Sequence, residues 1–335
     1  MDVNDIANDF TSSIYTHKIQ KSKFFNMLKS IYPFIKPITH RRLQILIRSN
    51  FVRHKLPSYT NIWPIDPDSA KPPTGWSGWP EGKRFAVVLT HDIESQKGLN
   101  NCHHLVNIEK KMGFRSSFNF VAEDYQVSKE FRNLLIYEGF EVGIHGIYHC
   151  ENPFRNKKTF QEHAIKINHY LKKWGAKGFR SPCMYHNLHY VHDLDVEYDA
   201  STFDTDPFEP QPDGVGTIFP IYIFNNISNH GYVELPYTLP QDFLLFILLK
   251  EKSIDIWKKK IDWIASNGGM ALLITHPDYM NFGENDLKYD EYAASLYEDM
   301  LQYLKEKYSN QYWHVLPKDM AHFWIKNCDK NLLLL

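Results

Sequence analysis

The stretch that decides the fold runs from Phe85 to Glu94 and reads FAVVLTHDIE, an apolar run that ends abruptly in polar residues. A second stretch of the same kind, Met270–Thr275, reads MALLIT and is followed by His276. Continuous apolar runs of this length are typical of strands buried on both faces of a parallel sheet. Because α/β folds carry their chemistry beyond the carboxyl ends of such strands, the polar residues after each run are the first candidates for a functional site.

Outward from these two runs, short apolar segments alternate with segments of helical periodicity. We expect strands at Phe85–Thr90, Ser117–Val121, Glu141–Ile144, Gly178–Arg180, Tyr198–Thr202, Thr217–Tyr222, Tyr232–Leu235, Met270–Thr275 and Trp313–Leu316. We expect helices at Asn101–Met112, Lys129–Glu138, Thr159–Trp174, Ile254–Ser266 and Asp290–Tyr308. The alternation predicts an α/β fold, built either as a β/α barrel or as a doubly wound sheet.

The part of the chain before Phe85 has a different character. Apolar residues recur at helical spacing from Phe24 to Tyr32 and again from Leu43 to Phe51. The following segment is rich in proline, which indicates little regular structure; its prolines include Pro64, Pro67, Pro72, Pro73 and Pro80. The sequence therefore divides into a helical N-terminal extension over residues 1–56, a linker over 57–83 and a main domain over 84–328.

Charge is balanced overall but not locally. The formal net charge of −1 argues against a nucleic-acid partner. Residues 16–55, however, contain ten Lys or Arg residues and no acid. This basic segment has two interpretations: a solvated helical face packed on the main domain, or a surface for peripheral contact with an anionic membrane.

Targeting signals and cysteine patterns point to an intracellular protein. The start of the chain, MDVNDIANDF, has no basic region followed by an apolar stretch, and no apolar run approaches the length of a membrane span. The four cysteines form no CxxC pair, which indicates reduced thiols. We expect a cytoplasmic protein that in one interpretation touches a membrane surface.

Polar residues follow four of the expected strands. The first ends in THDIE, a later one in HGIYH, the next in RSP and a late one in THPD. The spacing of His145 and His149 puts two imidazoles on one side of a turn, where they could share a cation with a carboxylate as third ligand. Asp, Glu and His side chains at one edge predict a metal site, a proton-transfer site, or both.

The order THDIE, HGIYH, FRSP and ITHP resembles that of the polysaccharide deacetylase family, which includes the NodB-type enzymes. The resemblance covers residues 84–280. It implies a distorted (β/α) barrel with a divalent metal, for which Zn²⁺ is the expected ion. By position, Asp92 corresponds to the general base that activates water, and His145 and His149 correspond to metal ligands. Arg180 corresponds to the arginine that orients the base, and His276 to the general acid for the leaving amine.

The sequence departs from the family pattern at three places. Ile93 stands where the family has a metal-binding Asp, and Glu94, which points the same way as Asp92 in an extended strand, is the natural substitute. We prefer Asp92 as base and Glu94 as ligand, and the reverse assignment stays open. Cys183 stands at the position of a family Tyr, where a backbone N–H could still stabilise an oxyanion. His91 replaces the usual Phe, and its role is open.

The resemblance implies a hydrolase that removes an N-acyl group, mainly acetyl, from an amino sugar during surface polysaccharide biosynthesis. The expected partner is an N-acylated sugar or glycan. Two alternatives remain open from the sequence. One is another C–N amide hydrolase, such as an amidase or deformylase. The other is a non-catalytic carbohydrate-binding barrel, which the Ile93 departure favours.

Overall fold

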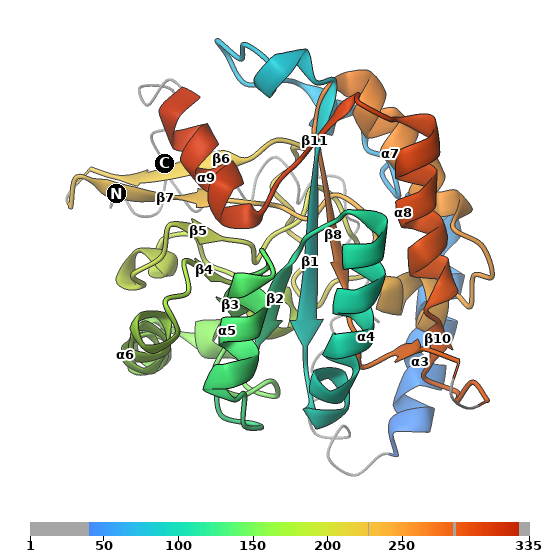
Figure 1. The fold of residues 1–335 in the computed structure, drawn as a ribbon, viewed down its shortest axis with the longest axis horizontal. Helices are drawn as coiled ribbons and strands as arrows, with labels where there is room; N and C mark the ends of the chain where they lie inside the picture. Colours follow the sequence, from blue (N-terminus) through green and yellow to red (C-terminus); the bar gives the residue numbers. More distant parts are fainter. Residues whose placement is uncertain (1–39, 227, 284–285, 328–335) are drawn as a thin grey trace.

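The computed structural model describes residues 40–226, 228–283 and 286–327 (Figure 1). The helix expected between Phe24 and Tyr32, the basic residues before His40 and Cys328 all lie outside this part of the chain. The described residues form an α/β fold in which a curled, distorted sheet is covered by helices (Figure 1). The expectation of a distorted (β/α) barrel with a helix before it is confirmed.

The described elements follow the order of the expected ones. The strands are β1 (Phe85–Ile93), β2 (Ser117–Phe120), β3 (Glu141–Ile144), β4 (Gly178–Phe179), β5 (Tyr198–Asp199), β6 (Ile221–Asn225), β7 (His230–Glu234), β8 (Met270–Thr275), β9 (Met280–Asn281), β10 (Tyr292–Ala293) and β11 (Tyr312–His314). The helices are α3 (Arg41–Lys55), α4 (Gln96–Met112), α5 (Lys129–Tyr137), α6 (Lys157–Trp174), α7 (Asp255–Asn267), α8 (Ser295–Lys307) and α9 (Pro317–Asn327).

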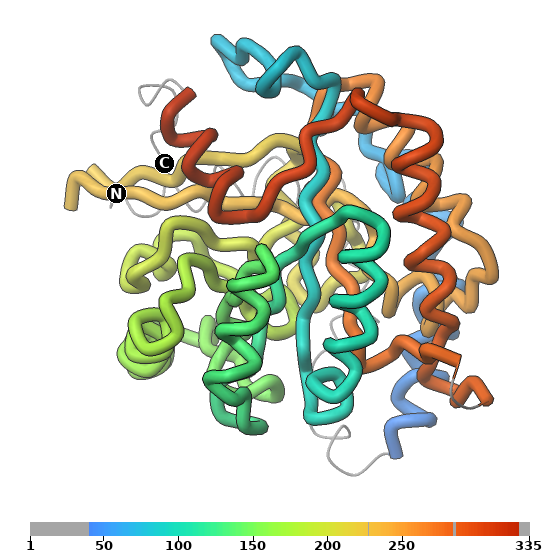
Figure 2. The backbone as a smooth tube through the Cα atoms, in the orientation of Figure 1, coloured from blue at the N-terminus to red at the C-terminus, as the bar shows by residue number. Residues whose placement is uncertain are grey.

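The sheet is built around β1, whose nine residues are all buried. Its strand order is β11-β1-β2-β3-β4-β5-β7-β6, and β8 pairs with β1 as well. These pairs are parallel except for the antiparallel pair of β6 and β7. Figure 2 shows β1 and β8 side by side. In their register, Ala86 is opposite Met270 and His91 is opposite Thr275. The two stretches that are most apolar in the sequence are therefore neighbours in the sheet.

The sheet curls until the segment after β7 reaches β8. The backbone N–H groups of Thr238 and Leu239 both donate to the Leu272 carbonyl, at 3.1 Å. A parallel bridge between Phe203 and Tyr237 continues the pairing of β5 and β7 in the same direction. Closure of this kind brings the carboxyl ends of β1, β3, β4 and β8 to one rim, as barrel geometry requires.

Capping residues fix where the helices begin and end. Ser95 precedes α4, and its Oγ accepts a hydrogen bond from the Lys97 N–H, which explains why this helix starts five residues before the expected Asn101. Gly113, at φ +83°, ends the same helix in the left-handed conformation that favours glycine. The polar first turn of α4 carries no apolar periodicity, so the sequence pattern placed the start too late.

Helix α3 packs on the main body through one face. Ile45, Ser49 and Val52 are buried, and Ser49 Oγ donates to the Leu248 carbonyl at 2.5 Å. Arg53 Nη2 donates to the Leu249 carbonyl at 2.9 Å. Both carbonyls belong to the end of a short π-helix, Phe243–Leu248, or to the residue after it. No described helix is long and apolar enough to cross a membrane.

Candidate active site

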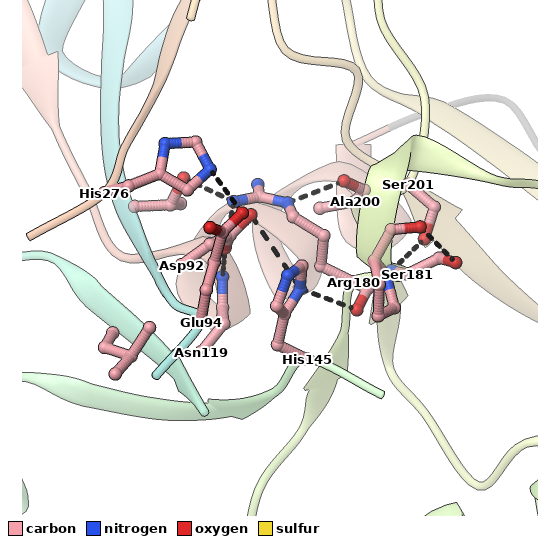
Figure 3. Close-up of polar contacts among 12 residues, drawn as sticks. Asp92, Glu94, Asn119, His145, Arg180, Ser181, Ala200, Ser201 and His276 are labelled. Carbon is pink, nitrogen blue, oxygen red and sulfur yellow. Dashed lines mark hydrogen bonds and ion pairs between the residues drawn. The ribbon is translucent and has the colours of Figure 1, made fainter. Parts of the chain in front are cut away.

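The predicted site residues meet at the carboxyl ends of four strands (Figure 3). Asp92 lies near the end of β1 and Glu94 just beyond it, while His145, Arg180 and His276 directly follow β3, β4 and β8. Asp92 Oδ2 lies 3.8 Å from His145 Nδ1, and Glu94 Oε1 lies 2.9 Å from His149 Nε2. The structure therefore brings the predicted carboxylates and the predicted imidazoles together.

Asp92 is held by two donors on one oxygen. Its Oδ1 accepts from Arg180 Nη1 and from Asn119 Nδ2, each at 3.0 Å. Gly143 makes room for Asn119, because a Cβ at this position would lie 2.1 Å from the amide oxygen of Asn119. Burial opposes ionisation of Asp92, but the charge of Arg180, helped by the hydrogen bond from Asn119, outweighs it and the pKa falls to about 2. Asp92 is thus an ionised, fixed carboxylate with Oδ2 facing His145.

Arg180 ties Asp92 to the neighbouring strands. Besides Asp92, Nη1 donates to Thr90 Oγ1 at 2.7 Å, and Nε donates to the Ala200 carbonyl at 2.8 Å. The side chain is fully buried, and Nη2 has no hydrogen-bond partner among the described residues. A buried guanidinium with three fixed contacts can orient a carboxylate more rigidly than a lysine could.

His145 is placed as a neutral imidazole. Its Nδ1 lies 3.1 Å from the Arg180 carbonyl, and since a carbonyl can only accept, Nδ1 carries the proton and Nε2 the lone pair. Burial lowers the pKa of His145 to about 4 despite the nearby Asp92. A ring whose Nδ1–H is held by a carbonyl is the usual state of a metal-ligating histidine.

His149 and Glu94 form a close pair without a well-formed hydrogen bond. The chain turns between the two histidines at Gly146, φ +73°, and the rings of His145 and His149 lie 5.6 Å apart. Burial opposes protonation of His149, but Glu94 raises its pKa to about 11. His149 Nε2 lies 2.9 Å from Glu94 Oε1 as an ion pair, although it is a buried atom without a well-formed hydrogen bond in the described structure.

His276 is paired with a carboxylate that sequence reasoning did not single out. Asp242 Oδ1 lies 2.6 Å from His276 Nδ1, and Asp242 Oδ2 accepts from the His276 backbone N–H at 2.7 Å and from the Tyr292 hydroxyl at 2.8 Å. Burial opposes protonation of His276, but Asp242 outweighs it and raises the pKa to about 10. His276 Nε2 faces Glu94 Oε1 at 3.8 Å.

The sequence contained a weak signal for Asp242. It ends the polar segment after β7 and precedes the apolar run Phe243–Leu248, which is the place of a helix cap, and its side chain does accept from the Phe243 N–H. A capping aspartate is common, and nothing in the sequence shows that this one also contacts a histidine 34 residues later.

The departures from the family pattern have plain structural outcomes. Ile93 is buried and belongs to the hydrophobic core. His91 is also buried, with Nδ1 2.7 Å from Thr275 Oγ1 and Nε2 2.6 Å from Glu109 Oε1. Because side chains alternate along a strand, His91 points to the face of β1 opposite Asp92. Cys183 has φ +55°, a left-handed conformation that is uncommon for a residue other than glycine.

The donor set Glu94, His145 and His149 fits a divalent cation in its chemistry. One carboxylate and two imidazoles are a donor set that zinc accepts, with an open position for water or substrate. His149 Nε2, a buried nitrogen without a hydrogen-bond partner, lies within this set. Within the described residues, however, no group of three or more His, Cys, Asp or Glu side chains is arranged to hold a metal ion. Instead, Glu94 and His149 are closed upon one another as an ion pair.

Comparisons with solved structures show which known proteins share this fold. A candidate polysaccharide deacetylase from Mycobacterium smegmatis matches with a TM-score of 0.61 and 15% identity, covering 79% of this chain and 98% of the other. Puue allantoinase matches with a TM-score of 0.58 and 15% identity, covering 76% and 94%. A candidate polysaccharide deacetylase from Pseudomonas aeruginosa PAO1 matches with a TM-score of 0.56 and 14% identity, covering 74% and 93%. Neither a protein-family model nor a curated protein sequence matches the chain. The fold is therefore that of the polysaccharide deacetylases, at low sequence identity.

Proposed function

We propose that this protein is a metal-dependent hydrolase that removes an N-acyl group from an amino sugar, with acetyl as the expected acyl group. The observation that carries the proposal is that two carboxylates and three imidazoles gather as a cluster at one rim of the sheet. One run of contacts joins Arg180, Asp92 and His145, and a second run joins His149, Glu94 and His276. Amide hydrolysis needs a base to activate water and an acid for the leaving amine, and this cluster has candidates for both.

Asp92 and His276 suit these two roles. Asp92 is ionised and its Oδ2 is not engaged by Arg180 or Asn119, so that it can take a proton from water. His276 is protonated, and because Nδ1 is engaged by Asp242, the proton on Nε2 is the one that can be given to the amine. The geometry thus supports opposite protonation states for the two groups before the reaction begins.

Glu94, His145 and His149 would hold the divalent ion, with Zn²⁺ as the expected metal. A bound ion at this place supplies polarisation of the amide carbonyl and a lower pKa for water. The chain's own contribution is to orient the ligands: the Arg180 carbonyl fixes the His145 ring, and the Asp124 carboxylate accepts from the His149 backbone N–H at 2.8 Å. Asp124 therefore steadies the turn that carries the second imidazole.

The assignment of Asp92 as base and Glu94 as ligand is also a proposal. Arg180 and Asn119 both engage Asp92, which suits a base that must keep one orientation. Glu94 instead pairs with His149, whose Nε2 lies 2.9 Å from Glu94 Oε1. Donation from these two groups to a common ion requires that Glu94 and His149 lie close together, as they do.

Another C–N hydrolase is the second candidate function. The likeness to an allantoinase at a TM-score of 0.58 favours it, because that fold match is nearly as good as the match to a deacetylase. A non-catalytic carbohydrate-binding barrel is the third, and the lack of an assembled metal cluster among the described residues favours it. These alternatives differ from the leading proposal in which bond, if any, is broken.

A hydrolysis assay separates the three candidates. Purified full-length protein, supplied with Zn²⁺, is incubated with a panel of N-acetylated sugars, including nucleotide-linked ones, and with a panel of small amides that includes allantoin. Release of acetate from a sugar, abolished in Asp92→Asn, is the expected result. Turnover of small amides alone would move the assignment to the second candidate, and sugar binding without turnover would move it to the third.

The basic segment suggests a place of action. Its described part, α3, has no acidic residue and exposes Leu43, Leu46 and Ile47 on the face away from the sheet. An apolar face flanked by arginines suits contact with an anionic lipid surface. Such contact would place a cytoplasmic enzyme beside lipid-linked sugars. Co-sedimentation with anionic vesicles, compared between wild type and a Leu43→Ser, Leu46→Ser, Ile47→Ser triple variant, tests this, and equal partitioning would end it.

A further inference from the structure

Glu94 needs more support than Asp92 because it lies one residue beyond the end of β1. Its side chain is partly exposed, at 18%, whereas that of Asp92 is almost fully buried, at 3%. A glutamate side chain has three rotatable bonds, so fixing its carboxylate costs more conformational entropy than fixing an aspartate. Contacts that hold Glu94 therefore decide whether a ligand at this position is ready to bind.

The main chain at Glu94 is fixed by a residue that follows β8. Asp278 Oδ2 accepts from the Glu94 backbone N–H at 2.9 Å, and Oδ1 accepts from the Gly98 backbone N–H at 3.2 Å. Gly98 is required for this approach, because a Cβ there would lie 2.1 Å from Asp278 Oδ2. The turn that carries Glu94 is thereby tied to the segment that carries His276.

The side chain of Glu94 is fixed by the next residue along the same segment. The Tyr279 hydroxyl donates to Glu94 Oε2, which leaves Oε1 facing His149 and His276. Arg41 Nη2 donates to the Tyr279 oxygen at 2.9 Å, and its guanidinium lies over the same ring, 5.6 Å from the centroid. Because a guanidinium has donors only, this contact obliges the Tyr279 hydroxyl to point its own hydrogen at Glu94.

We propose that Arg41 is a positioning residue of this site, which acts through Tyr279 to hold the Glu94 carboxylate with Oε1 towards His149 and His276. The proposal rests on the proposed function, in which Glu94 binds the ion. Helix α3 is then a part of the site rather than a separate extension.

The anchoring of α3 supports this role. Arg41 is the first residue of the helix, and its Nε also lies 3.8 Å from Asp290 Oδ2. Further along, Ser49 and Arg53 hydrogen-bond to the carbonyls of Leu248 and Leu249, so the helix is fixed at both ends against the main body. The Arg41 side chain is half-exposed, at 49%, so its place over Tyr279 depends on its contacts with the Tyr279 hydroxyl and the Asp290 carboxylate.

Metal affinity of the full-length protein tests the proposal without relying on activity. Zn²⁺ is titrated into metal-free wild type, Arg41→Ala, Tyr279→Phe and the double variant, in competition with a chelating dye. Outer contacts that orient a metal ligand are typically worth about 10- to 100-fold in affinity, so each single variant should bind Zn²⁺ at least about 10-fold more weakly. The double variant should bind no more weakly than Tyr279→Phe, because Arg41 acts through the hydroxyl that this variant lacks.

Arg42→Ala is the matched control. Arg42 is the neighbouring residue with the same charge, but its guanidinium lies over Tyr289 instead, 5.6 Å from that ring. Its replacement should leave the Zn²⁺ affinity unchanged, and Arg41→Lys, which keeps a donor and the charge, should recover part of the loss in Arg41→Ala. Tyr279→Phe keeps the ring that packs on Phe243, with 5.0 Å between the ring centroids. This variant therefore tests the proposal even if Arg41→Ala fails to fold.

The possible outcomes separate the two proposals. Wild type that binds no Zn²⁺ would overturn the proposed function, and the role of Arg41 with it. Wild type that binds Zn²⁺ while Arg41→Ala and Tyr279→Phe bind it equally well would overturn only the role of Arg41. An equal loss in Arg41→Ala and Arg42→Ala would point to general charge rather than to the Tyr279 contact, and would also overturn it.

Discussion

The imidazole of His276 and the carboxylate of Asp242 form a buried pair with 2.6 Å between Nδ1 and Oδ1. The same carboxylate accepts from the His276 backbone N–H, so Asp242 sets both the ring orientation and the protonated state of His276. This pair gives the candidate site a protonated imidazole. An imidazolium so held is in the state that a general acid needs before the reaction.

Replacing Asp242 with Asn should lower the hydrolytic rate by about 100-fold or more, because general acid catalysis contributes roughly that much and His276 would lose its protonated state. The measurement is kcat for acetate release. Tyr292→Phe is the control, since it removes only the hydroxyl that donates to Asp242 Oδ2, and it should change kcat by a few-fold at most. Equal rates in Asp242→Asn and wild type would show that His276 is not the acid.

Replacing Arg180 with Met should destabilise the protein by about 3 to 5 kcal/mol, because the Asp92 carboxylate would remain buried without its main counter-charge. Urea unfolding monitored by tryptophan fluorescence measures the change. Adding Asp92→Asn to Arg180→Met should restore part of the free energy of unfolding, since the uncompensated charge is then gone. Strictly additive losses in the double variant would contradict the coupling of the two side chains.

Replacing His91 with Phe should reduce stability and leave the site intact. The change removes a buried partner from Glu109 Oε1 and from Thr275, which costs about 2 to 3 kcal/mol in the free energy of unfolding. Because His91 points away from Asp92, the Zn²⁺ affinity and kcat of the folded variant should match those of wild type. A large loss of kcat at temperatures where the variant is fully folded would place His91 in the chemistry.

Two facing carboxyl groups should make the free energy of unfolding depend on pH. Asp199 on β5 is opposite Glu234 on β7, and burial raises the pKa of both, with the charge of Asp199 raising that of Glu234 further. The folded state therefore keeps protons that the unfolded state loses above about pH 4, and the free energy of unfolding falls as pH rises through this window. Asp199→Asn should reduce this fall. The free energy of unfolding of the variant, relative to that of the wild type, should therefore increase from pH 5 to pH 8.

Asp262→Asn is a control of opposite sign for this measurement. Burial opposes ionisation of Asp262, but hydrogen bonds from Lys307, Tyr303 and Tyr308 outweigh it and lower the pKa. The stability that this carboxylate contributes is present above about pH 4 and is lost as pH falls through the lowered pKa. The Asp262→Asn variant should therefore differ from wild type at neutral pH and approach it in acid. If the difference in free energy of unfolding from the wild type changed with pH in the same direction for both variants, the account of the Asp199 pair would be ruled out.

Sequence reasoning located the strands better than the connections. Each expected strand coincides or overlaps with an observed one, because runs such as Ala86–Leu89 are apolar over their whole length. The helix expected from Asp290 starts instead at Ser295, because Tyr292 and Ala293 pair with β9. That pairing is a contact between distant segments, which local periodicity does not reveal.

Besides β9 and β10, two longer elements were not predicted. No helix was predicted over Phe243–Leu248, since its pattern is apolar on every side and has no helical face. No helix was predicted over α9, although it begins with Pro317, which is a usual first residue of a helix. For Phe243–Leu248, the packing of the finished fold rather than a helical pattern in the segment decides the structure.

For the site, the motif order predicted the six residues that the structure brings together, but not their partners. Asn119, Asp242 and Tyr279 have ordinary surroundings in the sequence, and their contacts with Asp92, His276 and Glu94 exist only because the sheet curls. The contribution of Arg41 could not be read from the sequence either, since it comes from a helix that precedes the sheet by a proline-rich segment.

The most direct test of the central claim is calorimetric titration of Zn²⁺ into metal-free wild type, Asp92→Asn, Glu94→Gln and His149→Ala. The account predicts one ion per chain for wild type, a similar affinity for Asp92→Asn, and a large loss of affinity for Glu94→Gln and His149→Ala. Loss of binding in Asp92→Asn with retention in Glu94→Gln would exchange the roles of the two carboxylates. The account would be contradicted if the wild type took up no Zn²⁺, or if His149→Ala bound Zn²⁺ with the same affinity as the wild type.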